Sequence, residues 1–231
     1  MRLFLFDIDG TLVTARGAGR HALARALETI FGTRGPIDTY DFRGRTDPRI
    51  VWDLMRAAGV ADAVIEARLT DCFATYVAEL ETIIGDGAHV RVLPGIAEVV
   101  RALARREDAV VGLLTGNIEG GARVKLQPTG LWPFFRVGAF GSDHIDRRQL
   151  PAVACARARA LTARDFPFER VTIIGDTPLD VDCARACGAI AVSVATGQHV
   201  ADELAACAPD HLFGDFSDVE SVLATLTRNG A

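Results

Sequence analysis

The chain has 231 residues, 49% hydrophobic and 24% charged, which predicts a folded globular protein with one large core or a core and a smaller domain. Its formal net charge of −5 gives no general attraction to nucleic acid or anionic membrane surfaces, so neither is expected as a partner. The sequence has no run near the roughly 18 apolar residues of a membrane span and no room for a secretory leader, so we expect a cytoplasmic protein.

An apolar run at residues 3–6 predicts a buried strand, and this strand ends on two acids one residue apart, Asp7 and Asp9. Two carboxylates at the tip of a hydrophobic strand repel each other and are costly to desolvate. A compensating positive charge is therefore expected beside them, and a bound cation is the first candidate.

Residues 15–88 differ in character from the rest of the chain, because they carry apolar residues at helical spacing and no convincing strand. The expected helical stretches are residues 21–31, 50–58 and 63–83. We interpret this segment as a helical cap domain inserted after the first strand of an α/β core. The core domain would comprise residues 1–14 and 89–231, with the Pro- and Gly-containing residues 90–95 as the returning linker.

From residue 91 onward, short apolar runs alternate with amphipathic stretches, which predicts βα units. The expected strands are residues 109–114, 137–140, 171–174, 189–194 and 211–213. The expected helices between them include residues 94–106, 150–161 and 178–187. The predicted fold class is α/β, a Rossmann-like and mostly parallel sheet with helices on both faces. In such sheets ligands bind at the carboxyl ends of the strands, so these ends are considered together as one site.

Three of these strand ends carry small, polar or acidic residues. They are Asp-Ile-Asp-Gly-Thr at residues 7–11, Leu-Thr-Gly-Asn at 114–117 and Gly-Asp-Thr-Pro-Leu-Asp at 175–180. Each motif alone has an ordinary explanation, since the first suits a turn and the third suits a helix N-terminus. Their arrival at the same edge of a sheet favours a functional site.

The ordered set of motifs, with a helical insertion after the first and a basic loop at residues 142–148 before the third, resembles the haloacid dehalogenase superfamily. The resemblance is to its phosphatase branch with a helical cap, similar to phosphoglycolate phosphatases. It implies Mg²⁺-dependent hydrolysis of a small phosphorylated molecule through an aspartyl-phosphate on Asp7. Asp9 would protonate the leaving alcohol and then activate water. An acid at this second position disfavours a dehalogenase.

The resemblance also implies the groups that surround the phosphate. Asp7, the backbone carbonyl of Asp9 and Asp176 would hold Mg²⁺, with Asp180 supporting that shell or binding a metal-bound water. The ligands of the phosphoryl oxygens would be Thr115 and the backbone N–H groups of Gly116 and Asn117, at a helix N-terminus. Gly10 would permit the tight turn that leads the chain out of the sheet.

One departure from the family pattern concerns its lysine, which normally follows the third strand. This chain has Arg147 and Arg148 there, and we favour Arg147 as the substitute. Lys125, the only lysine in the chain, is the alternative, reaching back from the helix after Asn117. An arginine would contact phosphate through two prongs instead of a point charge.

The expected cap contains three arginines around Gly44, and they are interpreted either as surface charge or as a grip on a second anionic group of the substrate. Arg45 is the one that we favour for this role. No lysine lies between residues 15 and 88, which argues against the phosphonate-cleaving relatives that use a cap lysine.

Two alternative functions stay open: a phosphomutase of the same fold, and a non-catalytic phosphate-binding regulatory protein. The second has no need of a nucleophile and acid pair. A dinucleotide-dependent oxidoreductase is disfavoured because no GxGxxG follows the first strand. The natural substrate is left open by the sequence, as is the choice between a monomer and a homodimer.

Overall fold

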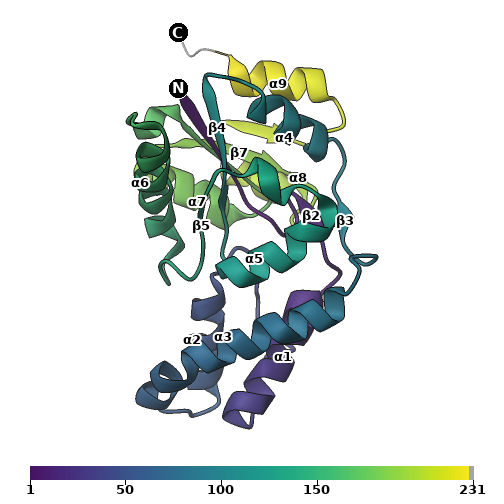
Figure 1. Ribbon diagram of the computed structural model, residues 1–231, viewed down its shortest axis with the longest axis vertical. Helices are drawn as coiled ribbons and strands as arrows, with labels where there is room; N and C mark the ends of the chain where they lie inside the picture. The colour runs from purple at the N-terminus through teal and green to yellow at the C-terminus, as the bar shows by residue number, and fades with distance from the viewer. Residues whose placement is uncertain (229–231) are drawn as a thin grey trace.

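The computed structural model describes residues 1–228 and confirms the α/β class (Figure 1). Its main sheet has six strands in the order β5-β4-β1-β6-β7-β8, and all of its neighbouring strands are parallel. The strands are β1 (Arg2–Phe6), β4 (Ala109–Leu114), β5 (Val137–Ala139), β6 (Val171–Gly175), β7 (Ile190–Val194) and β8 (His211–Phe213). The central strands are nearly continuous apolar runs because helices cover both faces of the sheet.

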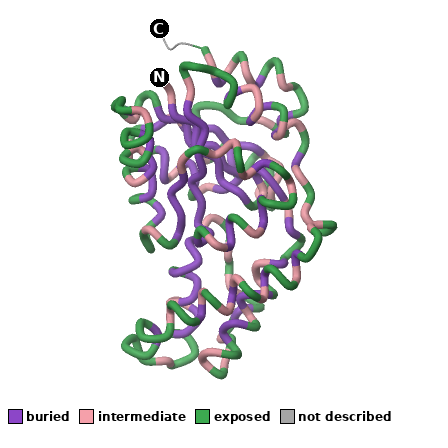
Figure 2. Tube along the Cα trace, in the orientation of Figure 1, coloured by how far each residue is buried: buried purple, intermediate pink, exposed green. Residues whose placement is uncertain are grey.

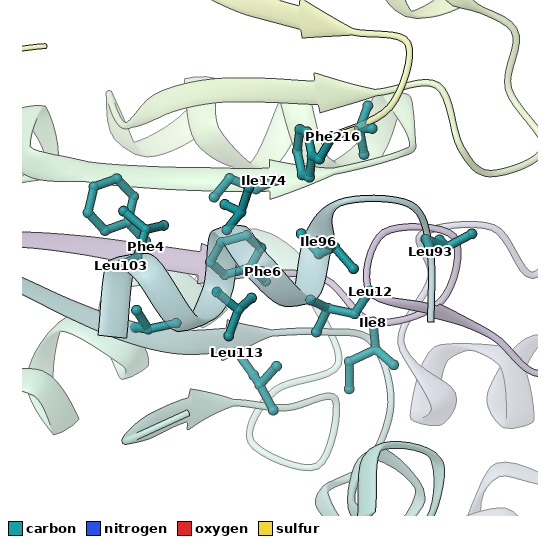
Figure 3. Close-up of a cluster of buried hydrophobic side chains, with 14 of the residues drawn as sticks. Phe4, Phe6, Ile8, Leu12, Leu93, Ile96, Leu103, Leu113, Ile174 and Phe216 are labelled. Carbon is teal, nitrogen blue, oxygen red and sulfur yellow. The ribbon is translucent and has the colours of Figure 1, made fainter. Parts of the chain in front are cut away.

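The side chains of β1 alternate between the two faces of the sheet. Phe4 and Phe6 belong to a cluster with residues of α4 (Ile96–Ala104) and α9 (Val219–Thr227). Figure 3 shows both phenylalanines in this cluster with Leu103 of α4 and Leu113 of β4. Leu3 and Leu5 belong to the opposite cluster, together with α6 (Leu150–Thr162) and α7 (Pro178–Cys187). Figure 2 shows the sheet as the most continuously buried part of the chain. This rigid sheet fixes the positions of its strand ends.

Three helices, α1 (Ala18–Phe31), α2 (Asp47–Ala57) and α3 (Asp62–Ile84), lie together at one end of the molecule (Figure 1). They surround a separate hydrophobic cluster. We call them the helical insertion. Their separate hydrophobic cluster supports the predicted division into a core domain and a cap at residues 15–88, and this division stays a prediction. Residues 229–231 of the predicted core lie outside the described residues.

The chain leaves and re-enters the core through two short strands. β2 (Val13–Thr14) pairs antiparallel with β3 (Arg91–Val92) in a small second sheet. Residues 90–95, expected as a plain linker, thus include a strand. A two-residue strand is too short to show an alternating pattern, and its pairing depends on a partner that is remote in sequence.

The remaining helices are α5 (Glu119–Leu126), α8 (Ala201–Ala206) and four short 3₁₀ helices: Gln127–Thr129, Trp132–Phe134, Arg147–Gln149 and Phe168–Arg170. The helix expected at residues 94–106 begins only at Ile96, because Gly95 has a left-handed φ of 71°. A Cβ at Gly95 would lie 1.7 Å from the carbonyl oxygen of Phe216, so the close approach requires glycine. Among the described helices, none combines the length and the apolar character needed to cross a membrane.

Candidate active site

A cavity of about 350 Å³ lies where the carboxyl ends of the central strands face the helical insertion. Nearly all the residues that the sequence singled out line this cavity. They are Asp7, Asp9, Gly10, Arg45, Thr115, Gly116, Asn117, Lys125, Arg147 and Asp176. The remaining one, Asp180, is buried beside them, on the first turn of α7.

Asp7 follows β1 directly and extends its pairing, because its backbone N–H donates to the carbonyl of Ile174 at 2.9 Å. Its carboxylate is buried. Burial raises the pKa of Asp7 to about 6, with the guanidinium of Arg147 opposing the shift and the carboxylate of Asp180 adding to it. A buried acid fixed to a rigid strand end is well placed to act as a nucleophile.

The buried guanidinium of Arg147 bridges two acids. Its Nη2 lies 3.3 Å from Oδ2 of Asp7 and donates to Oδ1 of Asp180 at 2.5 Å. Although burial opposes it, the two carboxylates together raise the pKa of Arg147, so the group is permanently charged. Arg148 instead points outward, where it pairs with Asp182 at 2.8 Å. Of the two arginines, Arg147 is therefore the one that lies beside Asp7, and its role as the substitute for the expected lysine stays a prediction.

Lys125 also lies in the site, against the other acid. Its Nζ is 2.6 Å from Oδ2 of Asp9 and 2.7 Å from Oδ1 of Asn117. The Asn117 amide in turn donates to Asp9 Oδ2 and Thr115 Oγ1, both at 2.9 Å. The side chain of Lys125 is 5% exposed and that of Asp9 is 47% exposed. Both candidate cations of the sequence thus occupy the site, and each has its own carboxylate.

Three buried acids, Asp7, Asp176 and Asp180, have carboxylate oxygens within 4.8 Å of one another. Burial, then the nearby charges of Asp180 and Asp7, raise the pKa of Asp176 well above its usual range. Arg147 pairs with Asp7 and Asp180 but is not paired with Asp176 among the described residues. The cluster therefore has the excess negative charge and the oxygen ligands that suit a divalent cation.

The three acids differ in how far their oxygens are already engaged. Asp180 accepts from Arg147 on Oδ1, and on Oδ2 from the Thr177 backbone N–H at 3.0 Å and hydroxyl at 2.7 Å. From the side chains of the described residues, Asp176 accepts one longer bond, from the Thr11 hydroxyl at 3.3 Å. Asp7 and Asp176 are therefore the better candidates to hold a metal directly, and Asp180 fits the supporting role.

Two further cavity residues, Asp47 and Tyr76, come from the helical insertion and were not singled out in the sequence. Both are buried. Burial raises the pKa of Asp47 to about 6. In the sequence, the stretch around Asp47 is notable for its arginines, which draw attention away from the acid. Tyr76 lies on an ordinary apolar helix face. Their positions depend on how the insertion packs on the sheet, which local spacing does not encode.

The chain belongs to the haloacid dehalogenase-like hydrolase family, whose sequence model matches residues 4–185; a second model, described as HAD-hydrolase-like, matches residues 152–219. Over 99% of its length the chain is 29% identical to the phosphoglycolate phosphatase of Synechococcus elongatus, of which it covers 100%. It is 27% identical, over 98% of its length, to the probable phosphatase IndB of Dickeya dadantii, of which it covers 95%.

The fold also matches that of a hydrolase from Pseudomonas syringae, with a TM-score of 0.74 at 20% identity, covering 99% of this chain and 100% of that one. The resemblance inferred from the ordered motifs is confirmed, as is the enzyme class, a hydrolase of the phosphatase type. The spacing of the motifs was informative because the fold brings them to one edge of the sheet.

Proposed function

We propose that the protein is a Mg²⁺-dependent phosphatase that hydrolyses a small phosphate monoester through an aspartyl-phosphate on Asp7. One observation carries the proposal: Asp7 and Asp9 have separate cations, Arg147 and Lys125, within one cavity. Two carboxylates in different environments can take different roles, one as nucleophile and one as proton carrier. The buried Asp7 suits the first role and the half-exposed Asp9 suits the second.

In the first half-reaction, a carboxylate oxygen of Asp7 attacks phosphorus and the ester P–O bond breaks. Asp9 gives a proton to the departing alkoxide, which leaves as the alcohol. In the second half-reaction, Asp9 takes a proton from water as the water oxygen attacks phosphorus. The bond between phosphorus and Asp7 then breaks, which releases inorganic phosphate and restores both carboxyl groups.

The other residues of the site would bind and orient the phosphoryl group. The Thr115 hydroxyl and the backbone N–H groups of Gly116 and Asn117 are donors at the end of β4, next to the start of α5. Arg147 offsets the charge on Asp7 and the phosphate. Mg²⁺, held by Asp7 and Asp176 with Asp180 behind them, would polarise a phosphoryl oxygen and offset its charge.

The size and lining of the cavity favour a small substrate with a second anionic group. A volume of about 350 Å³ is at the small end of ligand sites. Arg45 lines the cavity from the insertion, with its guanidinium 5.5 Å from the centre of the Tyr40 ring. The two neighbouring arginines are already paired with acids: Arg43 with Asp41 and Arg49 with Asp53. A carboxylate or a second phosphate would suit Arg45, and a phosphoglycolate-like ester meets this requirement.

The test is the release of inorganic phosphate from a panel of monoesters, including 2-phosphoglycolate, sugar phosphates and nucleotides, with and without Mg²⁺. Metal-dependent release that is lost in Asp7→Asn is the expected result. Retention of more than about a thousandth of the wild-type rate in a folded Asp7→Asn protein would contradict the nucleophile assignment.

The phosphomutase alternative predicts a different outcome of the same assay. It would give little net phosphate and would convert a sugar monophosphate when a sugar bisphosphate is added as activator. A phosphate-binding regulatory protein would bind inorganic phosphate without turning over any ester. Either result would replace the proposed phosphatase.

A further inference from the structure

Asp47, in the first turn of α2, makes two contacts with the loop that follows β4. Its backbone N–H donates to the carbonyl of Gly116 at 2.7 Å, and its Oδ2 accepts from the backbone N–H of Ile118 at 2.8 Å. These contacts bracket Asn117. The proposed phosphoryl-binding loop is therefore held from both sides by one residue of the helical insertion.

The contact with Ile118 anchors the start of α5. Ile118 is the N-cap residue of this helix, and its own side chain makes no capping hydrogen bond. Backbone N–H groups at a helix start have no partner within the helix, so they need acceptors from elsewhere. The N–H of Ile118 donates to Asp47, which is 71 positions away in the sequence, and the N–H of Glu119 donates to Ser142 Oγ at 3.4 Å. The same helix carries Lys125, so its start also sets the position of the cation on Asp9.

Asp47 belongs to a short stretch, residues 44–47, that we call the docking segment. Arg147 Nη1 donates to the carbonyl of Gly44 at 3.1 Å, and the Thr46 hydroxyl donates to the carbonyl of Ile145 at 2.7 Å. A Cβ at Gly116 would lie 2.0 Å from the Arg45 carbonyl oxygen, so the two backbones approach closely. The segment thus contacts the loops after β4 and β5 while presenting Arg45 to the cavity.

The burial of Asp47 is costly for the fold. Asp47 is only 8% exposed. Burial raises the pKa of its carboxyl group, although the charge of Lys125 opposes the shift. An apolar residue at this site would avoid the desolvation cost, and replacing buried ionic groups in this way is often neutral or stabilising. The carboxylate therefore points to a role in arranging the site.

We propose that Asp47 is a positioning residue that couples the seating of the helical insertion on the core to the geometry of the phosphoryl-binding loop and of Lys125. Seating of the docking segment delivers Arg45 to the substrate and, through Asp47, fixes the loop that receives the phosphate. The expected effect of Asp47 on turnover rests on the proposed phosphatase function. The hydrogen bond between Asp47 and Ile118 is independent of that function.

The test compares Asp47→Ala with Asp47→Asn, which keeps an acceptor oxygen for the Ile118 amide. Asp71→Ala, an exposed acid on α3 of the same insertion, is the matched control. We expect Asp47→Ala to lower kcat for the preferred ester by at least about 10-fold, and Asp47→Asn to recover most of it. Hydrogen exchange at the Ile118 amide should accelerate in Asp47→Ala and stay slow in Asp47→Asn and the control.

Thr46→Val provides a second variant for the case in which Asp47→Ala does not fold. It removes both the donor to Ile145 and the N-cap acceptor for the Arg49 backbone N–H of α2, and it keeps the Asp47 carboxylate. It should also lower kcat and accelerate exchange at Ile118. A folded Asp47→Ala or Thr46→Val protein with wild-type kcat and wild-type Ile118 exchange would overturn the proposal. If the wild-type protein released no phosphate, the phosphatase function would be contradicted. The exchange measurement would still show whether Asp47 protects the Ile118 amide.

Discussion

The ammonium of Lys125 lies 2.6 Å from Oδ2 of Asp9, while the guanidinium of Arg147 lies 3.3 Å from Oδ2 of Asp7. The two acids of the first motif therefore have different environments. Asp7 is buried and bridged to Asp180 through Arg147, whereas Asp9 is half-exposed and held by Lys125 and Asn117. The two cations come from separate elements: Lys125 from α5, which follows β4, and Arg147 from the short 3₁₀ helix after β5.

Replacing Lys125 tests whether its contact with Asp9 matters for proton transfer. Lys125→Met keeps the length of the side chain and removes the charge, which leaves Asp9 with the amide of Asn117 alone. We expect kcat to fall by about 10²-fold, at the lower end of general acid–base effects. The measurement is steady-state phosphate release, with the exposed Arg164→Met as a control. Wild-type kcat in a folded Lys125→Met protein would remove Lys125 from the mechanism.

Arg147→Lys should be damaging although it conserves the charge. A lysine ammonium cannot reproduce the planar guanidinium that reaches Asp7, Asp180 and the Gly44 carbonyl together. We expect at least a 10-fold loss of kcat/KM, as for other disrupted orienting contacts. Arg147→Ala should also cost about 3–5 kcal/mol in the free energy of unfolding, because it leaves two buried carboxylates uncompensated.

Arg148→Lys is the matched control for this experiment, since Arg148 pairs with Asp182 at the surface. Urea denaturation and phosphate-release kinetics of the three variants should separate the two neighbouring arginines. If Arg148→Lys lost as much activity as Arg147→Lys, the assignment of Arg147 as the cation beside the nucleophile would be wrong.

Mg²⁺ should raise the melting temperature, and the gain should increase with pH. Burial raises the pKa of Asp7 to about 6 and that of Asp176 well above its usual range. In metal-free protein these raised pKa values favour the folded state at low pH, and this contribution is lost as the pH rises through about 6. Mg²⁺ binds the ionised carboxylates, so it should stabilise the protein more at pH 7.5 than at pH 5.

Thermal unfolding with and without Mg²⁺ at these two pH values checks this prediction. Asp176→Asn should abolish the gain, whereas the exposed Asp71→Asn should preserve it. An equal gain at both pH values, or a gain that survives in Asp176→Asn, would show that Mg²⁺ acts somewhere other than at this cluster.

Much of the core was predictable because local patterns determine it. The strands at Ala109–Leu114 and His211–Phe213 and the helix at Pro178–Cys187 have the bounds that the sequence predicted. Their apolar runs are bounded by turn or capping residues, and the helix starts with a Thr177 and Asp180 capping box. The site residues on strand ends were predictable for the same reason, since a parallel sheet brings all such ends to one edge.

The contributions of the helical insertion were harder to predict. Asp47 and Tyr76 reach the cavity because α2 contacts the loop after β4 and α3 packs against α5, and no spacing within either helix encodes those contacts. The positions of Lys125 and Arg147 were hard to predict for a similar reason. The sequence indicated one place for a cation, whereas the structure puts Lys125 beside Asp9 and Arg147 beside Asp7. Which of them replaces the expected lysine stays a prediction.

The last prediction concerns substrate selection by Arg45, which lines the cavity from the segment before α2. Arg45→Ala should raise KM for an ester with a second anionic group, such as 2-phosphoglycolate, by about 10-fold, the equivalent of one lost charge-assisted hydrogen bond. KM for an ester of a neutral alcohol should stay unchanged, because such an ester has no second anionic group for Arg45 to bind. Arg49→Ala is the control, since Arg49 pairs with Asp53 on α2 and does not line the cavity. An equal change in KM for both esters would mean that Arg45 supports the cavity wall instead of binding the second anion.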